Sequence, residues 1–397
     1  MEKPAKSTRH HQFGLALLGL ALLLLGKLPE LDHASAVRAQ AKTGAAHALT
    51  ARQRLGQRLF REDGFTAPNG DFSTSCRTCH LFDEDPQGQR AYSDFFNRSW
   101  APYRTQDPKR SVNRNAPGLY DVALMPRLHW DGEFTSLEEL VIGTFSGRPL
   151  GWLPGESAEA FKQVRKVLLR DAGSAETYAQ QFKQAYNAEL ARLAEPKLLK
   201  LVADAVADYL RTFKSQLTAP YDEFLSANQL TALGNDPKAA SQLLAELDKR
   251  GATLKFVPGF DATALRGLRI FLRTKGTSSV GNCVTCHTPP LFTDFDFHNL
   301  GISQLEYDQV HGAGKFAVLP IPIATEVKRP VQQFREYPTR QKPHEADLGY
   351  WNFVPLATSP LRRAGESEEG FLQRMIGAVK TPGLRHLAYT WPYMHNG

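Results

Sequence analysis

The four cysteines of this 397-residue chain form two copies of one motif, Cys-x-x-Cys-His. The residues are Cys76, Cys79 and His80 in the first copy and Cys283, Cys286 and His287 in the second. Covalent haem attachment uses all three residue types, because two thiols one helical turn apart bind the haem vinyl groups and the adjoining imidazole becomes the proximal iron ligand. Redox disulfides or a zinc site built from the four thiolates would leave both histidines unexplained. The motifs therefore predict two covalently bound haem c groups.

The N-terminal segment has the order of a secretory signal. Basic residues precede an apolar run at residues 13–25, and the small residues Ala34 and Ala36 follow it. The run is short for crossing a bilayer. We expect a signal peptide over residues 1–36 and a periplasmic protein, with an uncleaved N-terminal anchor as the alternative. The net charge of +7 is not concentrated in a basic run, so no nucleic-acid partner is indicated.

Both haem motifs lie inside a longer repeat. Gly56 in LGQRLF recurs as Gly267 in RGLRIF, and both segments are expected to be amphipathic helices in which the glycine permits close packing. PGLYDVALMPRLHWDG at 117–132 recurs as PGLRHLAYTWPYMHNG at 382–397, with a constant offset of 265 positions between these two stretches. The repeat predicts two cytochrome c-like haem domains related by internal duplication. A helix predicted after Gly132 has no counterpart after Gly397, so we expect the C-terminal domain to be truncated.

The remaining patterns favour a mainly α fold. A capping-box-like start at Ser136 and Glu139 predicts a helix that begins at these residues and ends near residue 145. Helical periodicity also marks residues 159–168 and 194–217. Residues 302–380 show no clear period and are expected to form a long irregular loop. The predicted domains are residues 37–255, with the interdomain helices, and residues 256–397.

Several stretches resemble a known family. NRNAPGLYDVALMPRLHWDGEFTSLEEL, LRTFKSQLTAPYDEFL, CVTCHTPPLFTDFDFHNLG and KTPGLRHLAYTWPYMHNG are similar to the bacterial di-haem cytochrome c peroxidases and their MauG-like relatives. The resemblance implies that the N-terminal haem is peroxidatic and that the C-terminal haem transfers electrons. It also implies that Trp130 relays electrons between the haems. A calcium site at the domain interface is implied at Asn115, Thr390 and Pro392.

The chain departs from the family pattern at three places. Residues 81–128 contain no histidine that could block the peroxidatic iron, so this iron is expected to be open. The family's glutamine and glutamate acid–base pair is replaced by Leu140 and Leu150, which cannot move protons, so the catalytic acid–base group is left unidentified. The candidate substitutes are Glu133, Glu138 and Glu156, for which surface helix charges are the simpler interpretation. The distal ligand of the second haem is expected beyond Gly397.

Four further residues are candidates for a role beside the second haem, and His298 for one near a haem propionate. His298 is expected to be a structural hydrogen bonder near a haem propionate, and His395 is the repeat counterpart of Trp130. Met375, Tyr350 and His344 are weaker candidates for the second haem's axial ligand.

The leading hypothesis is an exported di-haem oxidoreductase that reduces hydrogen peroxide. Its electrons would come from a small cytochrome, a copper protein or a protein substrate, and a homodimer is common in the family. The alternative is a non-enzymatic di-haem electron carrier.

Overall fold

The computed structural model describes residues 48–68, 74–84, 90–93, 114–170, 176–231, 237–274, 281–323, 328–387, 390 and 393–396. All of them belong to one compact unit, Ala45–Gly397. The predicted signal peptide at residues 1–36 lies outside the described residues. Within the described ranges, no helix is long and apolar enough to cross a membrane.

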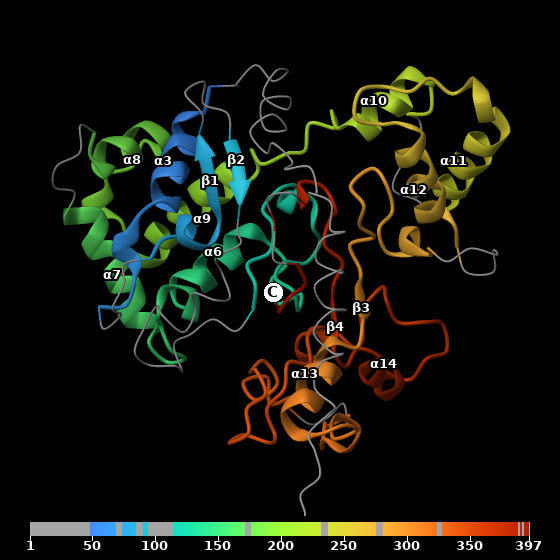
Figure 1. Ribbon diagram of the computed structural model, residues 1–397. Helices are drawn as coiled ribbons and strands as arrows, with labels where there is room; N and C mark the ends of the chain where they lie inside the picture. Colours follow the sequence, from blue (N-terminus) through green and yellow to red (C-terminus); the bar gives the residue numbers. More distant parts are fainter. Residues whose placement is uncertain are drawn as a thin grey trace, which may run out of the picture. The chain divides into compact units, whose positions relative to one another are not determined.

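The described chain is mainly helical, as predicted (Figure 1). The helices are α3 (Ala51–Phe60), α4 (Cys76–Cys79), α6 (Leu137–Phe145), α7 (Ser157–Arg170), α8 (Tyr178–Tyr186), α9 (Glu195–Leu210), α10 (Pro220–Ala227), α11 (Pro237–Arg250), α12 (Ala262–Leu272), α13 (Ile302–His311) and α14 (Glu368–Arg374). Two short antiparallel pairs complete the regular structure: β1 (Leu81–Glu84) with β2 (Arg90–Ser93), and β3 (Phe297–Asn299) with β4 (Ala378–Lys380).

The first hydrophobic cluster is formed mainly by α3, α6, α7, α8 and α9. Helix α9 begins with Pro196 in its first turn, a position that needs no backbone donor, and it buries apolar side chains at helical spacing. Helix α3 packs closely on α9 at Gly56, where an added Cβ would lie 1.9 Å from the carbonyl oxygen of Ala205. The close packing expected for this glycine is therefore confirmed.

Helix α6 begins where the sequence predicted. The hydroxyl of Ser136 accepts a hydrogen bond from the backbone N–H of Glu139 at 3.1 Å, which satisfies one of the free donors of the first turn. The side chain of Glu139 does not complete a capping box, because its carboxylate accepts a hydrogen bond from the hydroxyl of Thr135 instead. The cap fixes where α6 starts, and α6 supplies one wall of the site.

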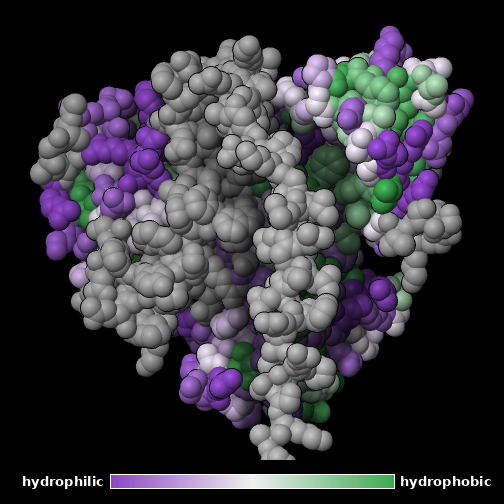
Figure 2. Space-filling model, viewed as in Figure 1, coloured by the Kyte–Doolittle hydropathy of each residue, from purple (hydrophilic) through white to green (hydrophobic). Residues whose placement is uncertain are grey.

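A second cluster joins α10, α11 and α12, and the surface of this group shows hydrophobic residues among hydrophilic ones (Figure 2). Phe256 and Ile270 are among its exposed apolar side chains, at 51% and 48%. Among the described residues, nothing lies within 4 Å of a Cβ added at Gly267 in α12. The close approach expected at Gly267 by analogy with Gly56 is therefore wrong, because this face of α12 meets no neighbouring backbone.

Residues 302–380 differ from the predicted irregular loop. They contain α13, α14 and β4, and with Phe297 they form a third hydrophobic cluster around buried aromatic side chains such as Phe334, Trp351 and Phe371. Sequence periodicity does not predict this cluster, because its side chains project from turns and short helices, where burial follows no repeat. The segment thus has a packed core of its own.

Candidate functional site

The first haem motif forms a single helical turn. In α4, the backbone N–H of Ser75 donates to the hydroxyl of Thr78 at 3.0 Å, and the N–H of His80 donates to the carbonyl oxygen of Cys76 at 2.9 Å. This turn sets the two thiols one helical turn apart, with the imidazole directly after them. Burial, followed by the neighbouring Cys79, raises the pKa of the Cys76 thiol to about 12.

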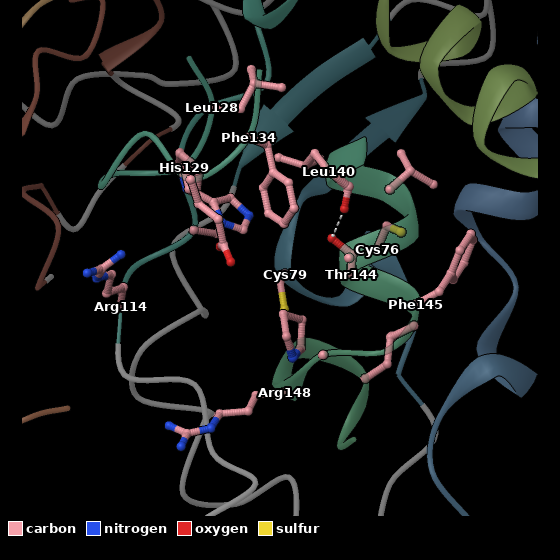
Figure 3. Close-up of a pocket in the computed structure, with 18 of the residues that line it drawn as sticks. Cys76, Cys79, Arg114, Leu128, His129, Phe134, Leu140, Thr144, Phe145 and Arg148 are labelled. Atoms are coloured by element: carbon pink, nitrogen blue, oxygen red, sulfur yellow. Dashed lines mark hydrogen bonds and ion pairs between the residues drawn. The ribbon is translucent and has the colours of Figure 1, made fainter. Parts of the chain in front are cut away.

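Both thiols and the imidazole line a cavity of about 550 Å³ (Figure 3). Apolar side chains from α3, α6 and α9 form much of its wall, including Phe60, Val141 and Val206. The residues of the motif therefore fit a haem: the donor set is complete, and the cavity is of cofactor size with a largely apolar lining.

The second motif holds its histidine in a defined orientation. His287 Nδ1 lies 2.9 Å from the carbonyl oxygen of Phe292, which can only accept, so Nδ1 carries the proton and Nε2 is left for an iron. The short helix Cys283–Thr285 follows α12 closely, and Cγ2 of Ile270 lies 3.5 Å from an added Cβ at Gly281. These residues also fit a haem.

Trp130 is fixed through both its ring and its backbone. The indole N–H donates to the carbonyl oxygen of Asn115 at 2.8 Å, and the carbonyl oxygen of Trp130 accepts from the N–H of Lys380 at 2.9 Å. The ring also meets that of His395 edge-on, at a centroid distance of 6.4 Å. Trp130 and its repeat counterpart are thus neighbours, and Trp130 lines the cavity.

A buried ion network lies beside Trp130. Arg114 contacts Asp131 at 2.5 Å and Asp347 at 2.6 Å, and Arg335 contacts Asp131 at 2.9 Å. Burial opposes ionisation of Asp131, but Arg114 and Arg335 outweigh it and lower the pKa of this carboxyl. Through this network the segment containing Asp347 is bound to the first half of the chain.

The cavity also holds a histidine that the sequence analysis missed. His129 lines it together with Glu133, and His129 Nδ1 lies 3.1 Å from a carboxylate oxygen of Glu133. His129 directly follows residues 81–128, the range that contains no histidine. The signal was present in the sequence, because His129 directly precedes Trp130 and Glu133 follows four residues later.

The structure distinguishes among the three glutamates that could replace the missing acid–base pair. Leu140 and Leu150 line the cavity, as does Glu133. Glu138 pairs instead with Arg211, and Glu156 accepts from the backbone N–H of Leu153; neither lines the cavity. Of the three candidate glutamates, only Glu133 is placed to act there.

The remaining predicted residues fall into two groups. His298 Nε2 lies 2.7 Å from a carboxylate oxygen of Asp294, and both are near the second motif, since Asp294 contributes to the raised pKa of Cys286 after burial. Met375 and Tyr350 are buried in the third cluster, and His344 is exposed. Membership of that core accounts for Met375 and Tyr350 without ligation.

The predicted calcium ligands are described only in part. The Asn115 amide donates to the carbonyl oxygen of Met394 at 3.3 Å, and the N–H of Thr390 donates to the carbonyl oxygen of Leu387. Pro392 lies outside the described residues. The calcium site stays a prediction.

Comparison with known proteins agrees with the motifs. Residues 50–230 match the family described as di-haem cytochrome c peroxidase. The chain is 24% identical over 344 residues to the cytochrome-c peroxidase IdrP1 of Denitromonas iodatirespirans, covering 86% of this chain and 68% of that protein. It is 22% identical over 346 residues to the methylamine utilization protein MauG of Methylophilus methylotrophus, covering 86% and 67%.

Among solved structures, the diheme peroxidase BthA from Burkholderia thailandensis matches with a TM-score of 0.49 and 18% identity, covering 88% of this chain and 69% of that one. The sequence comparisons confirm the predicted resemblance to di-haem cytochrome c peroxidases and MauG. These matches indicate an oxidoreductase of the peroxidase type, and the description of the family matched by residues 50–230 implies two c-type haems.

Proposed function

We propose that the protein is an exported di-haem c-type cytochrome that reduces hydrogen peroxide to water. One haem would be held by Cys76, Cys79 and His80, and the other by the motif at residues 283–287. The electrons would come from a small cytochrome, a copper protein or a protein substrate. Export rests on the signal-like segment at residues 1–36, and dimer formation stays a prediction of the resemblance.

One observation carries the proposal. The thiols of Cys76 and Cys79, the imidazole of His80 and the indole of Trp130 line the same cavity. When bound there, a haem supplies the redox chemistry. The chain's own residues bind it, exclude water with an apolar wall, and hold Trp130 in one orientation through the carbonyl oxygen of Asn115. A fixed, buried indole suits the proposed relay of electrons.

Two reciprocal backbone hydrogen bonds support the proposed duplication. The N–H of Asn115 donates to the carbonyl oxygen of His395 at 2.8 Å, and the N–H of Lys380 donates to the carbonyl oxygen of Trp130 at 2.9 Å. The two donors are 265 positions apart in the sequence, and so are the two acceptors. Positive φ angles recur at the same offset: 59° at Asp121 and 62° at His386, then 62° at His129 and 68° at Met394. Such backbone values are uncommon outside glycine, so their recurrence supports two domains of common origin, at residues 37–255 and 256–397.

The structure also gives a reason to keep the second candidate function. Leu140 and Leu150 occupy the family's acid–base positions, and both line the cavity. A cavity without a proton-transfer group would suit a non-enzymatic electron carrier, in which both irons are six-coordinate and low-spin.

One experiment separates the two candidates. The full-length protein, matured in a host that attaches haem c and oxidised to the diferric state, receives one equivalent of hydrogen peroxide while its haem absorbance is followed by stopped flow. A rapid change in the spectrum is expected for a peroxidase. An unchanged spectrum with two low-spin irons would reject the peroxidase and leave the electron carrier.

A further inference from the structure

We propose that His129 is the proton-transfer residue of the cavity and that Glu133 is its positioning residue, together replacing the acid–base pair lost at Leu140 and Leu150. The inference rests on the proposed peroxidase function and names the residues that would move protons for it.

The first support is placement. His129 and Glu133 line the cavity that also contains both thiols of the first motif and His80. The backbone of His129 is left-handed, with φ of 62°, and this turn directly precedes the fixed Trp130. The imidazole ring also packs edge-on against Phe134 at a centroid distance of 5.0 Å, and both side chains are seen at the cavity in Figure 3.

The second support is the orientation of the ring. His129 Nδ1 lies 3.1 Å from Oε2 of Glu133. An ionised carboxylate only accepts hydrogen bonds, so Nδ1 carries the proton and Nε2 of the neutral ring is free to accept another. A carboxylate that sets the tautomer of a catalytic imidazole is the arrangement found in acid–base triads.

The charges around the pair keep Glu133 ionised. Burial opposes its ionisation, but the hydrogen bond from His129 and the charge of Arg335 outweigh burial, and the pKa of Glu133 is lowered. Arg335 Nη2 lies 2.8 Å from Glu133, while Asp131, itself paired with Arg114, faces both His129 and Glu133 and acts against ionisation of Glu133. Glu133 is thus a fixed acceptor, and His129 is the partner that can exchange a proton.

The other titratable side chains of the cavity serve less well. Glu336 forms an ion pair with Arg148 at 2.6 Å. Burial lowers the pKa of Lys380 to about 8 although Asp131 opposes the shift, so Lys380 remains mostly a cation at neutral pH. Imidazole is the side chain whose ordinary charge change falls near neutral pH, which suits a group that must take and return a proton.

The proposed step balances as follows. Reduction of one hydrogen peroxide breaks its O–O bond, consumes two electrons and two protons, and yields two water molecules. Nε2 of His129 accepts the proton of one oxygen and returns it to the other, which departs as water with the electron pair of the broken bond. Two electrons from the donor and two solvent protons convert the remaining oxygen to the second water.

The test compares His129→Gln and Glu133→Gln with exposed controls, Lys315→Gln and Glu159→Gln, in the full-length di-haem protein. The first readout is the dissociation constant for cyanide, because hydrogen cyanide must give up a proton to a nearby base when it binds ferric iron. The second is the stopped-flow rate with peroxide between pH 5 and 8. The resting spectrum and haem content verify that each variant is intact.

We expect His129→Gln to weaken cyanide binding about tenfold, to slow the peroxide reaction about 100-fold or more, and to flatten its pH profile. Glu133→Gln should give a smaller loss with a displaced pH profile, and both controls should stay within about twofold of the parent.

Three other results are decisive. A parent protein that does not react with peroxide would reject the proposed function itself. A reactive parent with unchanged His129→Gln values would overturn only this inference. A resting spectrum that turns from low-spin to high-spin in His129→Gln would also overturn it, since His129 would then be an iron ligand.

Discussion

Arg114 is the residue on which the buried charges around the cavity depend. Its guanidinium contacts the carboxylates of Asp131 and Asp347, whose side chains are 0% and 8% exposed. Burial opposes the charge of Arg114, yet the two carboxylates outweigh it and raise the pKa of Arg114. Breaking a buried pair from one side is costly, because the remaining carboxylates lose a partner that little water can replace, although Asp131 keeps its contact with Arg335.

We therefore predict that Arg114→Ala lowers the free energy of unfolding by about 3–5 kcal/mol. Urea unfolding of the di-haem protein at pH 7 measures the change. Arg192→Ala is the control, because Arg192 is 84% exposed and its ion pair with Glu189 should contribute less than about 1 kcal/mol. Equal effects of the two substitutions would contradict the role given to Arg114.

At the scale of elements, the contact between α3 and α9 depends on the absence of a side chain at Gly56. An added Cβ there would overlap the carbonyl oxygen of Ala205, which is backbone and cannot move without shifting α9. Gly267, its counterpart in α12, has no atom of the described chain within 4 Å of an added Cβ. The two repeat copies thus use the same residue in different surroundings.

Substitution of these two glycines should have opposite effects. Gly56→Ala is expected to destabilise the protein by about 1–3 kcal/mol through overpacking. Gly267→Ala should stabilise it by about 0.5–1 kcal/mol, since alanine loses less conformational entropy in a helix. Thermal unfolding of both variants measures the two changes in stability. A loss of stability in Gly267→Ala would contradict the open surroundings of this position in α12.

The elements that the sequence predicted correctly are those with local signals. Ser136 caps α6, and Pro196 stands in the first turn of α9, so both helices start where predicted. The cluster formed by residues 302–380 was missed because Phe334 and Trp351 are buried by contacts between distant segments, which no local period reveals. His129 differs, because the sequence held its signal beside Trp130, and only its left-handed backbone, with φ of 62°, is not specified by its residue type.

At the scale of the whole molecule, three distant segments meet at His386. Its ring stacks on Tyr120 at 3.9 Å, and Nε2 lies 3.1 Å from the hydroxyl of Ser215, which donates to Asp121 at 2.5 Å. Burial lowers the pKa of His386 from 6.5 to about 4, although Asp121 opposes the shift. Protonation therefore favours the unfolded chain, and the stability that the neutral ring contributes is complete above pH 6.5 and is lost as the pH falls toward 4.

We predict that His386→Phe, which keeps a ring against Tyr120, makes unfolding less sensitive to pH between 6.5 and 4. The measurement is the urea midpoint of parent and variant at pH 7, 6 and 5. His344→Gln, at an exposed position, should retain the pH dependence of the parent. An unaltered slope in His386→Phe would mean that other groups account for the acid sensitivity.

The residues that line the cavity come from distant parts of the chain, and this affects the order in which the protein matures. Cys76, Cys79 and His80 come early in the chain, whereas Arg335 and Lys380, which line the same cavity, come more than 250 residues later. Synthesis runs from the N-terminus, so the thiols exist for a time before this part of the wall does. If the first haem binds as proposed, its covalent attachment would precede closure of the cavity on that side, and the later segment would enclose a cofactor that is already attached.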